Sequence, residues 1–288
     1  MAARLFTLVE NYGLKNNFVL AEFRCVGHNI RTSVVFVDTP LRTDTKPLQN
    51  KLERLSALDQ LFRYRAAAPE GEAWFQVVKG DIPVLISAPH ACMHVRDGVS
   101  KMQEEYTGAI ALFLAELCGC HAVVTRYKTY EDPNWQSDSI YKDAIGSLVS
   151  DRDIRFCIDL HGMRNIYHMG VALGTINGNA CDSHLVLPHF LNAGFRHVAL
   201  EELAPDKQNA WCNVVVDHPK FTGGLTNNTV TRFVSQQLGI PGVQVELSSQ
   251  ARVVESAATD DWPLEYRGDP VAINASLAAL QSLIVANA

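Results

Sequence analysis

The chain has 288 residues, of which 47% are hydrophobic and 19% are charged, a balance typical of globular rather than disordered proteins. Its formal net charge of −6 gives no electrostatic reason to bind nucleic acid or an anionic membrane. No apolar run approaches the roughly 20 residues of a membrane span, and the first ten residues lack the apolar core of a signal peptide. We therefore expect a cytoplasmic protein that acts on a small-molecule substrate, with no nucleic acid or membrane partner; a homo-oligomer is compatible with the sequence.

Residues 1–70 are predicted to form an N-terminal extension or small β-rich subdomain. Runs of strand-forming residues at 17–25 and 31–37 predict two strands joined by a glycine-containing turn. Leucines then recur at spacings of three and four over residues 48–62, which predicts an amphipathic helix. A loop with proline and glycine at 66–72 is the predicted boundary. The function of this extension is not readable from its residues.

Residues 71–288 alternate between strand and helix patterns and are predicted to form the hydrolytic domain. Strands are predicted at 74–78, 82–88, 122–126, 156–160, 169–173 and 242–247. Helices are predicted at 103–117, 139–149, 182–192, 228–238 and 271–286. Strands separated by helix-length segments form a largely parallel or mixed sheet with helices on both faces. The predicted fold is therefore a three-layer α/β domain.

Two histidines follow predicted buried strands directly. His90 comes after the apolar run 82–88, and His161 comes directly after a similar run at 156–160. Open α/β sheets place ligands at the carboxyl ends of their strands, and hydrolytic zinc sites often combine two histidines with one carboxylate. Glu104 and Glu105, at the start of the next helix, could supply that carboxylate, although either alone is equally an ordinary first-turn acid. The pattern predicts one zinc per chain.

Two further carboxylates lie inside predicted strands. Asp159 points to the same side of its strand as His161, so it could accept that histidine's second ring proton or bond a nearby loop instead. Glu246 interrupts an apolar strand, where a charged residue rarely stays buried without a partner or a role. Beside a zinc-bound water it would act as general base. A buried salt bridge to Arg252 is the competing interpretation, and we favour the catalytic one.

Arginines and cysteines supply the other candidates. Arg96 and Arg252 could hold a substrate carboxylate through two parallel hydrogen bonds, although a solvated position is the usual fate of a single arginine. The seven cysteines contain no CxxC pair, which favours reduced thiols over a zinc ribbon or disulfides. Cys92 lies close to His90 and could be a nucleophile, but buried reduced cysteines are usually inert. A Cys92-dependent hydrolase is therefore the third-ranked hypothesis.

Four segments occur in this order along the chain: Ser87-Ala-Pro-His90, Glu104-Glu105, Asp159-Leu-His161-Gly162 and Val243-Gln-Val-Glu246. Their order and spacing resemble the N-formylglutamate amidohydrolase family, itself related to zinc carboxypeptidases and aspartoacylases. The resemblance covers residues 80 to 255, and Asp132-Pro-Asn134 also looks similar to the family's pattern. It implies a zinc-carboxypeptidase-like fold and one zinc held by His90, Glu104 and His161, with Glu246 as general base. Glu104 is chosen over Glu105 because family members keep a threonine three residues after the ligand, here Thr107.

Two departures from the family bear on the substrate. The strand glutamate is followed by Leu247-Ser248 where the family has Asn-Arg, and Cys92 stands where the family has glycine. The first hypothesis is a zinc-dependent amidohydrolase that cleaves the C–N amide bond of a small N-formyl or N-acyl amino acid or a short peptide. A zinc-bound water would be its nucleophile. The alternative is a catalytically altered ligand-binding or regulatory protein on the same fold.

Overall fold

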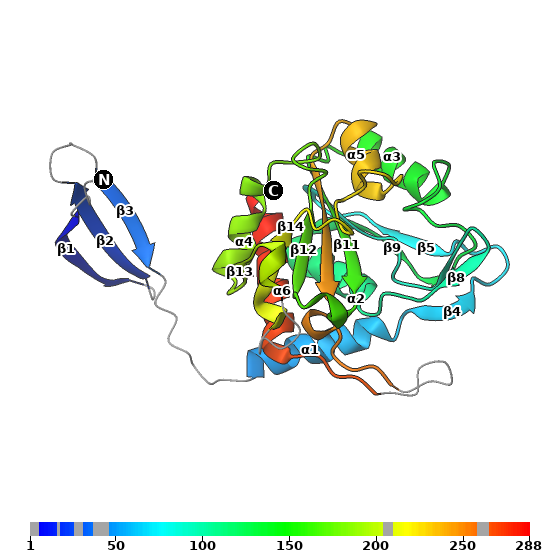
Figure 1. Ribbon diagram of the computed structural model, residues 1–288, viewed down its shortest axis with the longest axis horizontal. Coiled ribbons are helices and arrows are strands. Elements are labelled where there is room, and N and C mark those ends of the chain that lie inside the picture. Colours follow the sequence, from blue (N-terminus) through cyan, green and yellow to red (C-terminus); the bar gives the residue numbers. More distant parts are fainter. Residues whose placement is uncertain (1–5, 16–17, 26–30, 37–45, 204–209, 258–264) are drawn as a thin grey trace. The chain divides into compact units, whose positions relative to one another are not determined.

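A computed structural model describes residues 6–15, 18–25, 31–36, 46–203, 210–257 and 265–288 (Figure 1). The chain divides into two compact units, Met1–Pro47 and Leu48–Ala288. In the first unit an antiparallel sheet has the order β1 (Phe6–Lys15), β2 (Phe18–Cys25), β3 (Arg31–Phe36). The two predicted strands correspond to β2 and β3, and β1 is an additional strand. The predicted turn between them lies outside the described residues.

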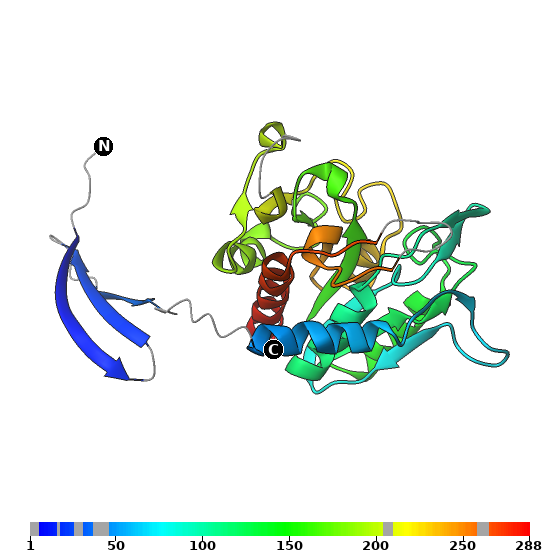
Figure 2. The ribbon, with the colours of Figure 1, turned by 90° about the horizontal axis from the view of Figure 1, so that it is seen from below.

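The second unit includes the predicted amphipathic helix α1 (Lys46–Asp59) from Leu48 onward, and the short strand β4 (Arg63–Ala67). Leu55 and Leu58 of α1 are buried in the main hydrophobic core of this unit. Figure 2 shows α1 meeting the closing helix α6 (Pro270–Ala286), where Lys51 Nζ donates to Asn274 Oδ1 at 3.3 Å. The two units therefore divide at Pro47, upstream of the loop at 66–72. The functional assignment of 1–70 and 71–288 remains a prediction.

An eight-stranded sheet forms the centre of the second unit, in the order β13-β14-β12-β15-β11-β6-β9-β5. The strands are β5 (Phe75–Val78), β6 (Ile82–Ala88), β9 (Cys120–Thr125), β11 (Phe156–Met163), β12 (Val171–Gly174), β13 (Arg196–His197), β14 (Asn213–Val216) and β15 (Gly242–Ser248). Neighbours run parallel except for the antiparallel pairs β12–β15 and β5–β9. The predicted mixed, mostly parallel α/β sheet is confirmed.

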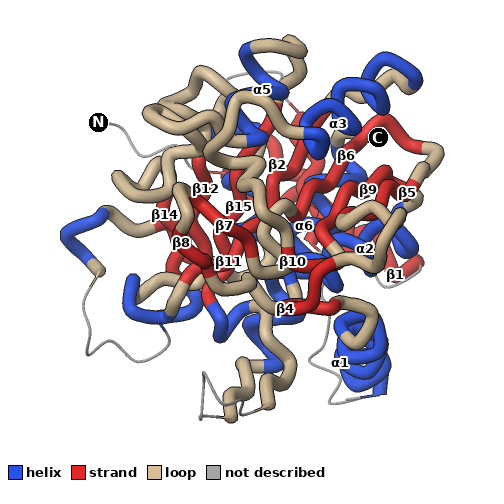
Figure 3. Tube along the Cα trace, turned by 90° about the vertical axis from the view of Figure 1, so that its right-hand side faces the viewer, coloured by secondary structure: helices blue, strands red, loops and turns tan. Residues whose placement is uncertain are grey.

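Helices cover both faces of this sheet, as Figure 3 shows for α1 and α2 on one side and α3 and α5 on the other. The remaining helices are α2 (Thr107–Cys118), α3 (Ile140–Asp151), α4 (Leu187–Asn192) and α5 (Val230–Gln236). One apolar core joins α1, α2, α4 and α6 to the sheet, and a second joins α3 and α5 to it. Short 3-10 helices occupy Asn165–Tyr167, Ser183–Leu185, Leu200–Glu202, Ala210–Cys212 and Ser249–Ala251. Within the described ranges, no helix combines the length and the apolar character that crossing a membrane requires.

The sheet face under α3 and α5 changes from apolar to polar along its strands. In β11, Cys157 lies in the apolar core beneath these helices, whereas Asp159 and His161 follow on the same face. In β15, Gln244 and Glu246 likewise share one face near the carboxyl end. Because β11 and β15 are parallel neighbours, their polar residues gather at one edge of the sheet. This edge holds the candidate site.

Three local differences from the predicted elements affect the site. β11 runs to Met163, so His161 lies within the strand instead of after it. α2 begins at Thr107 and not at residue 103, because Tyr106 has a φ of 66°, which a helix cannot contain. A hairpin of β7 (His94–Arg96) and β8 (Val99–Lys101) and a small parallel pair of β4 with β10 (Tyr127–Lys128) were not predicted.

Candidate metal centre

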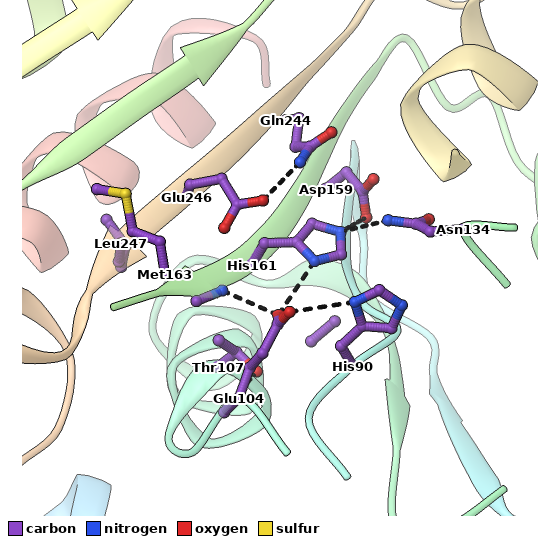
Figure 4. Close-up of polar contacts among 12 residues, drawn as sticks. His90, Glu104, Thr107, Asn134, Asp159, His161, Met163, Gln244, Glu246 and Leu247 are labelled. Carbon is purple, nitrogen blue, oxygen red and sulfur yellow. Dashed lines mark hydrogen bonds and ion pairs between the residues drawn. The ribbon is translucent and has the colours of Figure 1, made fainter. Parts of the chain in front are cut away.

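His90, Glu104 and His161 converge from the turn after β6, the turn before α2, and β11 (Figure 4). The carboxylate of Glu104 lies between the two rings, with Oε1 3.1 Å from His90 Nδ1 and Oε2 3.1 Å from His161 Nδ1. One possible ligand atom from each residue lies within 4.8 Å of the others. The rings are buried, with 5% of His90 and 1% of His161 exposed, so they need polar partners.

The turn before α2 fixes Glu104 in this position. Its backbone N–H donates to the carbonyl of His90 at 2.9 Å, and its own carbonyl accepts from the Thr107 hydroxyl at 2.7 Å. Tyr106, in the left-handed region, donates its N–H to the Tyr64 hydroxyl at 3.2 Å. Glu105 instead accepts a hydrogen bond from Gln103. The structure thus brings Glu104, and not Glu105, between the two histidines.

Asp132 contacts the far side of His90 and was not predicted as a site residue. Its Oδ1 is 2.8 Å from His90 Nε2 and accepts the backbone N–H of Asn134 at 2.9 Å. Its Oδ2 accepts from Arg96 Nε at 2.5 Å. A carboxylate on the distal nitrogen fixes the orientation of a ligand histidine. The sequence pointed to this role only through the similarity of Asp132-Pro-Asn134 to the family's pattern. Residues of an irregular loop have no periodicity from which the direction of a side chain can be predicted.

The far side of His161 has two polar neighbours. Asp159 Oδ1 lies 3.3 Å from Nε2, within ion-pair distance, but makes no hydrogen bond among the described residues. Its Oδ2 accepts from the N–H and the hydroxyl of Thr231 at 3.2 and 3.1 Å, so these hydrogen bonds come from the first turn of α5 and not from a loop. The amide Nδ2 of Asn134 lies 2.7 Å from the same His161 nitrogen. Figure 4 shows Asn134 and Asp159 together on this side of the ring.

The electrostatics of this cluster match a cation site. Burial would lower the pKa of His90, but the carboxylates of Glu104 and Asp132 outweigh it and raise that pKa to about 9. Burial would raise the pKa of Glu104, yet the two histidines hold it well below its usual range. Both histidines turn Nδ1 toward Glu104 and Nε2 toward an outer carboxylate, the arrangement of metal-ligand histidines. Two imidazoles and a carboxylate form a donor set that suits zinc.

A second group, His90, His94 and Asp132, also has possible ligand atoms within 4.8 Å of one another. The rings of His90 and His94 stack with their centroids 4.0 Å apart. Asp132, however, already pairs with the Arg96 guanidinium and with a backbone N–H. A dication there would compete with Arg96 for the buried Asp132 carboxylate, so the group around Glu104 is the better candidate.

Glu246 lies beside this group on β15, in register with His161 on the parallel neighbour β11. It is 6% exposed, and Gln244 Nε2 donates to its Oε1 at 2.7 Å. Burial raises the pKa of Glu246 to about 7; the Glu104 carboxylate also raises it, whereas His161 lowers it. No ion pair joins Glu246 to Arg252 among the described residues, so the competing salt-bridge interpretation is not supported.

Arg252 and Arg96 have different surroundings. Arg252 is 6% exposed, and its guanidinium donates to the carbonyls of Glu105, Met163 and Leu247 at 3.0, 3.0 and 2.8 Å. It therefore fastens the ends of β11 and β15 to the turn that carries Glu104. The Arg96 side chain is 28% exposed and stacks over the Trp135 ring at 5.2 Å. Substrate binding by either arginine remains a prediction.

Cys92 is a poor candidate for a nucleophile. Its side chain is fully buried, and its Sγ lies 3.7 Å from the carbonyl of Thr125. Burial raises the pKa of the thiol to about 12, so the reactive thiolate does not form near neutral pH.

No protein-family model matches the chain, and no curated protein matches it. Among solved structures, the chain is similar to the crystal structure of a Shewanella denitrificans OS-217 protein named as a candidate carboxypeptidase A. The two are 13% identical, the alignment covers 93% of this chain and 78% of that one, and the TM-score is 0.40. A likeness at this level transfers no residue role, and the resemblance to N-formylglutamate amidohydrolases is not confirmed.

Proposed function

We propose that the chain is a zinc-dependent hydrolase that cleaves the C–N amide bond of a small N-formyl or N-acyl amino acid or a short peptide. The observation that carries this proposal is the convergence of His90, Glu104 and His161 beside the buried carboxylate of Glu246. The three residues would hold the ion. When bound, zinc polarises a carbonyl and lowers the pKa of its water to about 7.

Glu246 is suited to move the proton in this reaction. A base works best when its pKa lies near the working pH, and burial brings the pKa of Glu246 to about 7. The carboxylate would take a proton from the attacking water and pass it to the leaving nitrogen. Gln244 holds one carboxylate oxygen through a 2.7 Å hydrogen bond, which leaves the other oxygen for the proton.

Arg96 supports a substrate with a free carboxylate. Its Nε is anchored by Asp132, and its guanidinium plane rests on Trp135. No hydrogen bond among the described residues occupies its two terminal nitrogens. A guanidinium fixed in this way offers a two-pronged site for a carboxylate with little loss of side-chain entropy. Asp132 also contacts His90, so such a carboxylate would bind close to the candidate metal site.

Zinc analysis and a substrate panel test the proposal on the full chain. We expect one zinc per chain in wild type and in the matched control His94→Ala, and its loss in His90→Ala, Glu104→Gln and His161→Ala. The panel should contain N-formyl and N-acyl amino acids, their carboxyl esters and dipeptides. We expect hydrolysis that chelators abolish and that Glu246→Gln reduces at least 100-fold. Metal content and hydrolysis that persist in all three ligand variants would refute the proposal.

One departure from the family favours the ligand-binding or regulatory alternative. β15 ends in Leu247-Ser248, and the buried Ser248 hydroxyl has no hydrogen-bond partner among the described residues. Zinc bound without hydrolysis of any compound in the panel would support this alternative.

A further inference from the structure

The side-chain amide of Asn134 has a fixed orientation. Asn134 is 5% exposed, and its Oδ1 accepts the backbone N–H of Val230 at 2.8 Å. Its Nδ2 therefore lies 2.7 Å from His161 Nε2. Turning the amide over would set its NH2 group against the Val230 N–H, two donors facing each other. Asn134 thus presents a donor to His161.

The amide donor of Asn134 selects one tautomer of the His161 ring. A ring nitrogen that accepts a hydrogen bond carries no proton, so the proton of a neutral His161 lies on Nδ1, 3.1 Å from Glu104 Oε2. A ring with protons on both nitrogens would set Nε2–H against the Asn134 amino group at 2.7 Å. A metal bound between the histidines needs the lone pair of Nδ1, and therefore a ring with its proton on Nε2.

Asp159 favours that other form. Its Oδ1 lies 3.3 Å from Nε2, is buried and has no hydrogen-bond partner among the described residues, so it is available to accept a proton carried by Nε2. Thr231 holds the second oxygen of Asp159 through its N–H and hydroxyl. Val230 and Thr231 open α5, so one turn of helix supports both neighbours of the same histidine nitrogen. Asn134 therefore favours a His161 ring with its proton on Nδ1, and Asp159 favours a ring with its proton on Nε2.

We propose that Asn134 is a positioning residue that opposes metal binding at His161, and that Asp159 favours it. The pair would set the affinity of the site. This inference rests on the proposed metal site. When a metal binds, one proton leaves Nδ1 for solvent and one is taken up at Nε2, so the ring stays neutral. Nε2 then donates to Asp159 instead of accepting from Asn134.

Zinc affinity, measured by competition with a chelator, tests whether Asn134 opposes metal binding and Asp159 favours it. Asn134→Ala removes the donor without adding charge, and Asn134→Asp offers an acceptor while still accepting from Val230. We expect tighter zinc binding in both, by about tenfold for the aspartate, whereas Asp159→Asn should weaken binding by about 10- to 100-fold. Asn213→Ala is the matched control, because Asn213 is also a buried asparagine (2% exposed) and donates to the carbonyl of His168. It should leave the affinity unchanged.

Nitrogen-15 NMR of the metal-free protein gives an independent measurement, with the His161 signals identified by their loss in His161→Gln. We expect a proton on Nδ1 in wild type and on Nε2 in Asn134→Asp. A wild-type ring protonated on Nε2 or on both nitrogens would overturn the inference, as would weaker zinc binding in Asn134→Ala. Absence of zinc binding in every protein, wild type included, would instead refute the proposed function, and this role with it.

Discussion

Replacing Gln244 by leucine should raise the pH that Glu246 needs to act as a base. Gln244 donates a 2.7 Å hydrogen bond to Glu246 Oε1, and this bond lowers a pKa that burial raises to about 7. A hydrogen bond to a charged group contributes about 1.5–3 kcal/mol, which corresponds to about 1–2 pH units. Because a base works when deprotonated, activity rises with pH through its pKa. The acid limb of kcat/KM should therefore move up by about 1–2 units in the variant.

The measurement is kcat/KM against pH from 5 to 10 for wild type, Gln244→Leu and Gln244→Met. Both variants remove the donor at similar side-chain volume, so both should lose about tenfold or more near pH 6 and recover at high pH. Bound zinc would lower the pKa of Glu246 in all three proteins, but the difference between them should remain. An acid limb that stays in place while kcat/KM falls equally at every pH would refute the assigned role of Gln244.

Three further predictions concern the frame of the site. In Gly162→Ala a Cβ would lie 2.5 Å from Arg252 Nε; urea unfolding should show a loss of about 1–3 kcal/mol. Gly146→Ala is the control, because its nearest atom is 3.9 Å away. Arg252→Met leaves the carbonyls of Glu105, Met163 and Leu247 without their donor, so we expect a loss of about 2–4 kcal/mol; an unchanged Tm with a raised KM would indicate substrate binding instead. Zinc at 100 times its Kd should stabilise wild type by about 2.7 kcal/mol in thermal unfolding, and a similar gain in His161→Ala would contradict the assigned ligand.

The sequence predicts best where local signals agree with the final packing. The strand Ile82–Ala88 is predicted to the residue, because it is apolar except for Ser87 and is bounded by a turn and a proline. The start of α2 is missed because Tyr106 adopts a φ of 66° and donates to Tyr64, a contact from a distant part of the chain. Periodicity carries no information about such a contact. The helix Lys46–Asp59 is predicted from its leucine spacing, but an amphipathic helix does not reveal which surface it covers.

The predicted site residues divide in the same way. His90, Glu104 and His161 are foreseeable as a group, because parallel strands and the next helix start meet at one sheet edge. The role of Asp132 is not foreseeable, since a loop aspartate resembles any solvated turn residue until its contact to His90 is known. Arg252 shows the converse, because its spacing from Glu246 suggests an ion pair and its guanidinium instead binds three backbone carbonyls.

The turn of residues 132–134 contacts both His90 and His161, which come from different strands, and also Arg96. Asp132 contacts the distal nitrogen of His90, and Asn134 contacts that of His161. The same Asp132 accepts a hydrogen bond from Nε of Arg96, the residue proposed to hold a substrate carboxylate. Both histidines and the arginine therefore take their orientation from one three-residue segment, which Val230 and the Asn134 N–H hold in place. On the proposed function, metal binding and substrate recognition would share this support, and a shift of the turn would change both together.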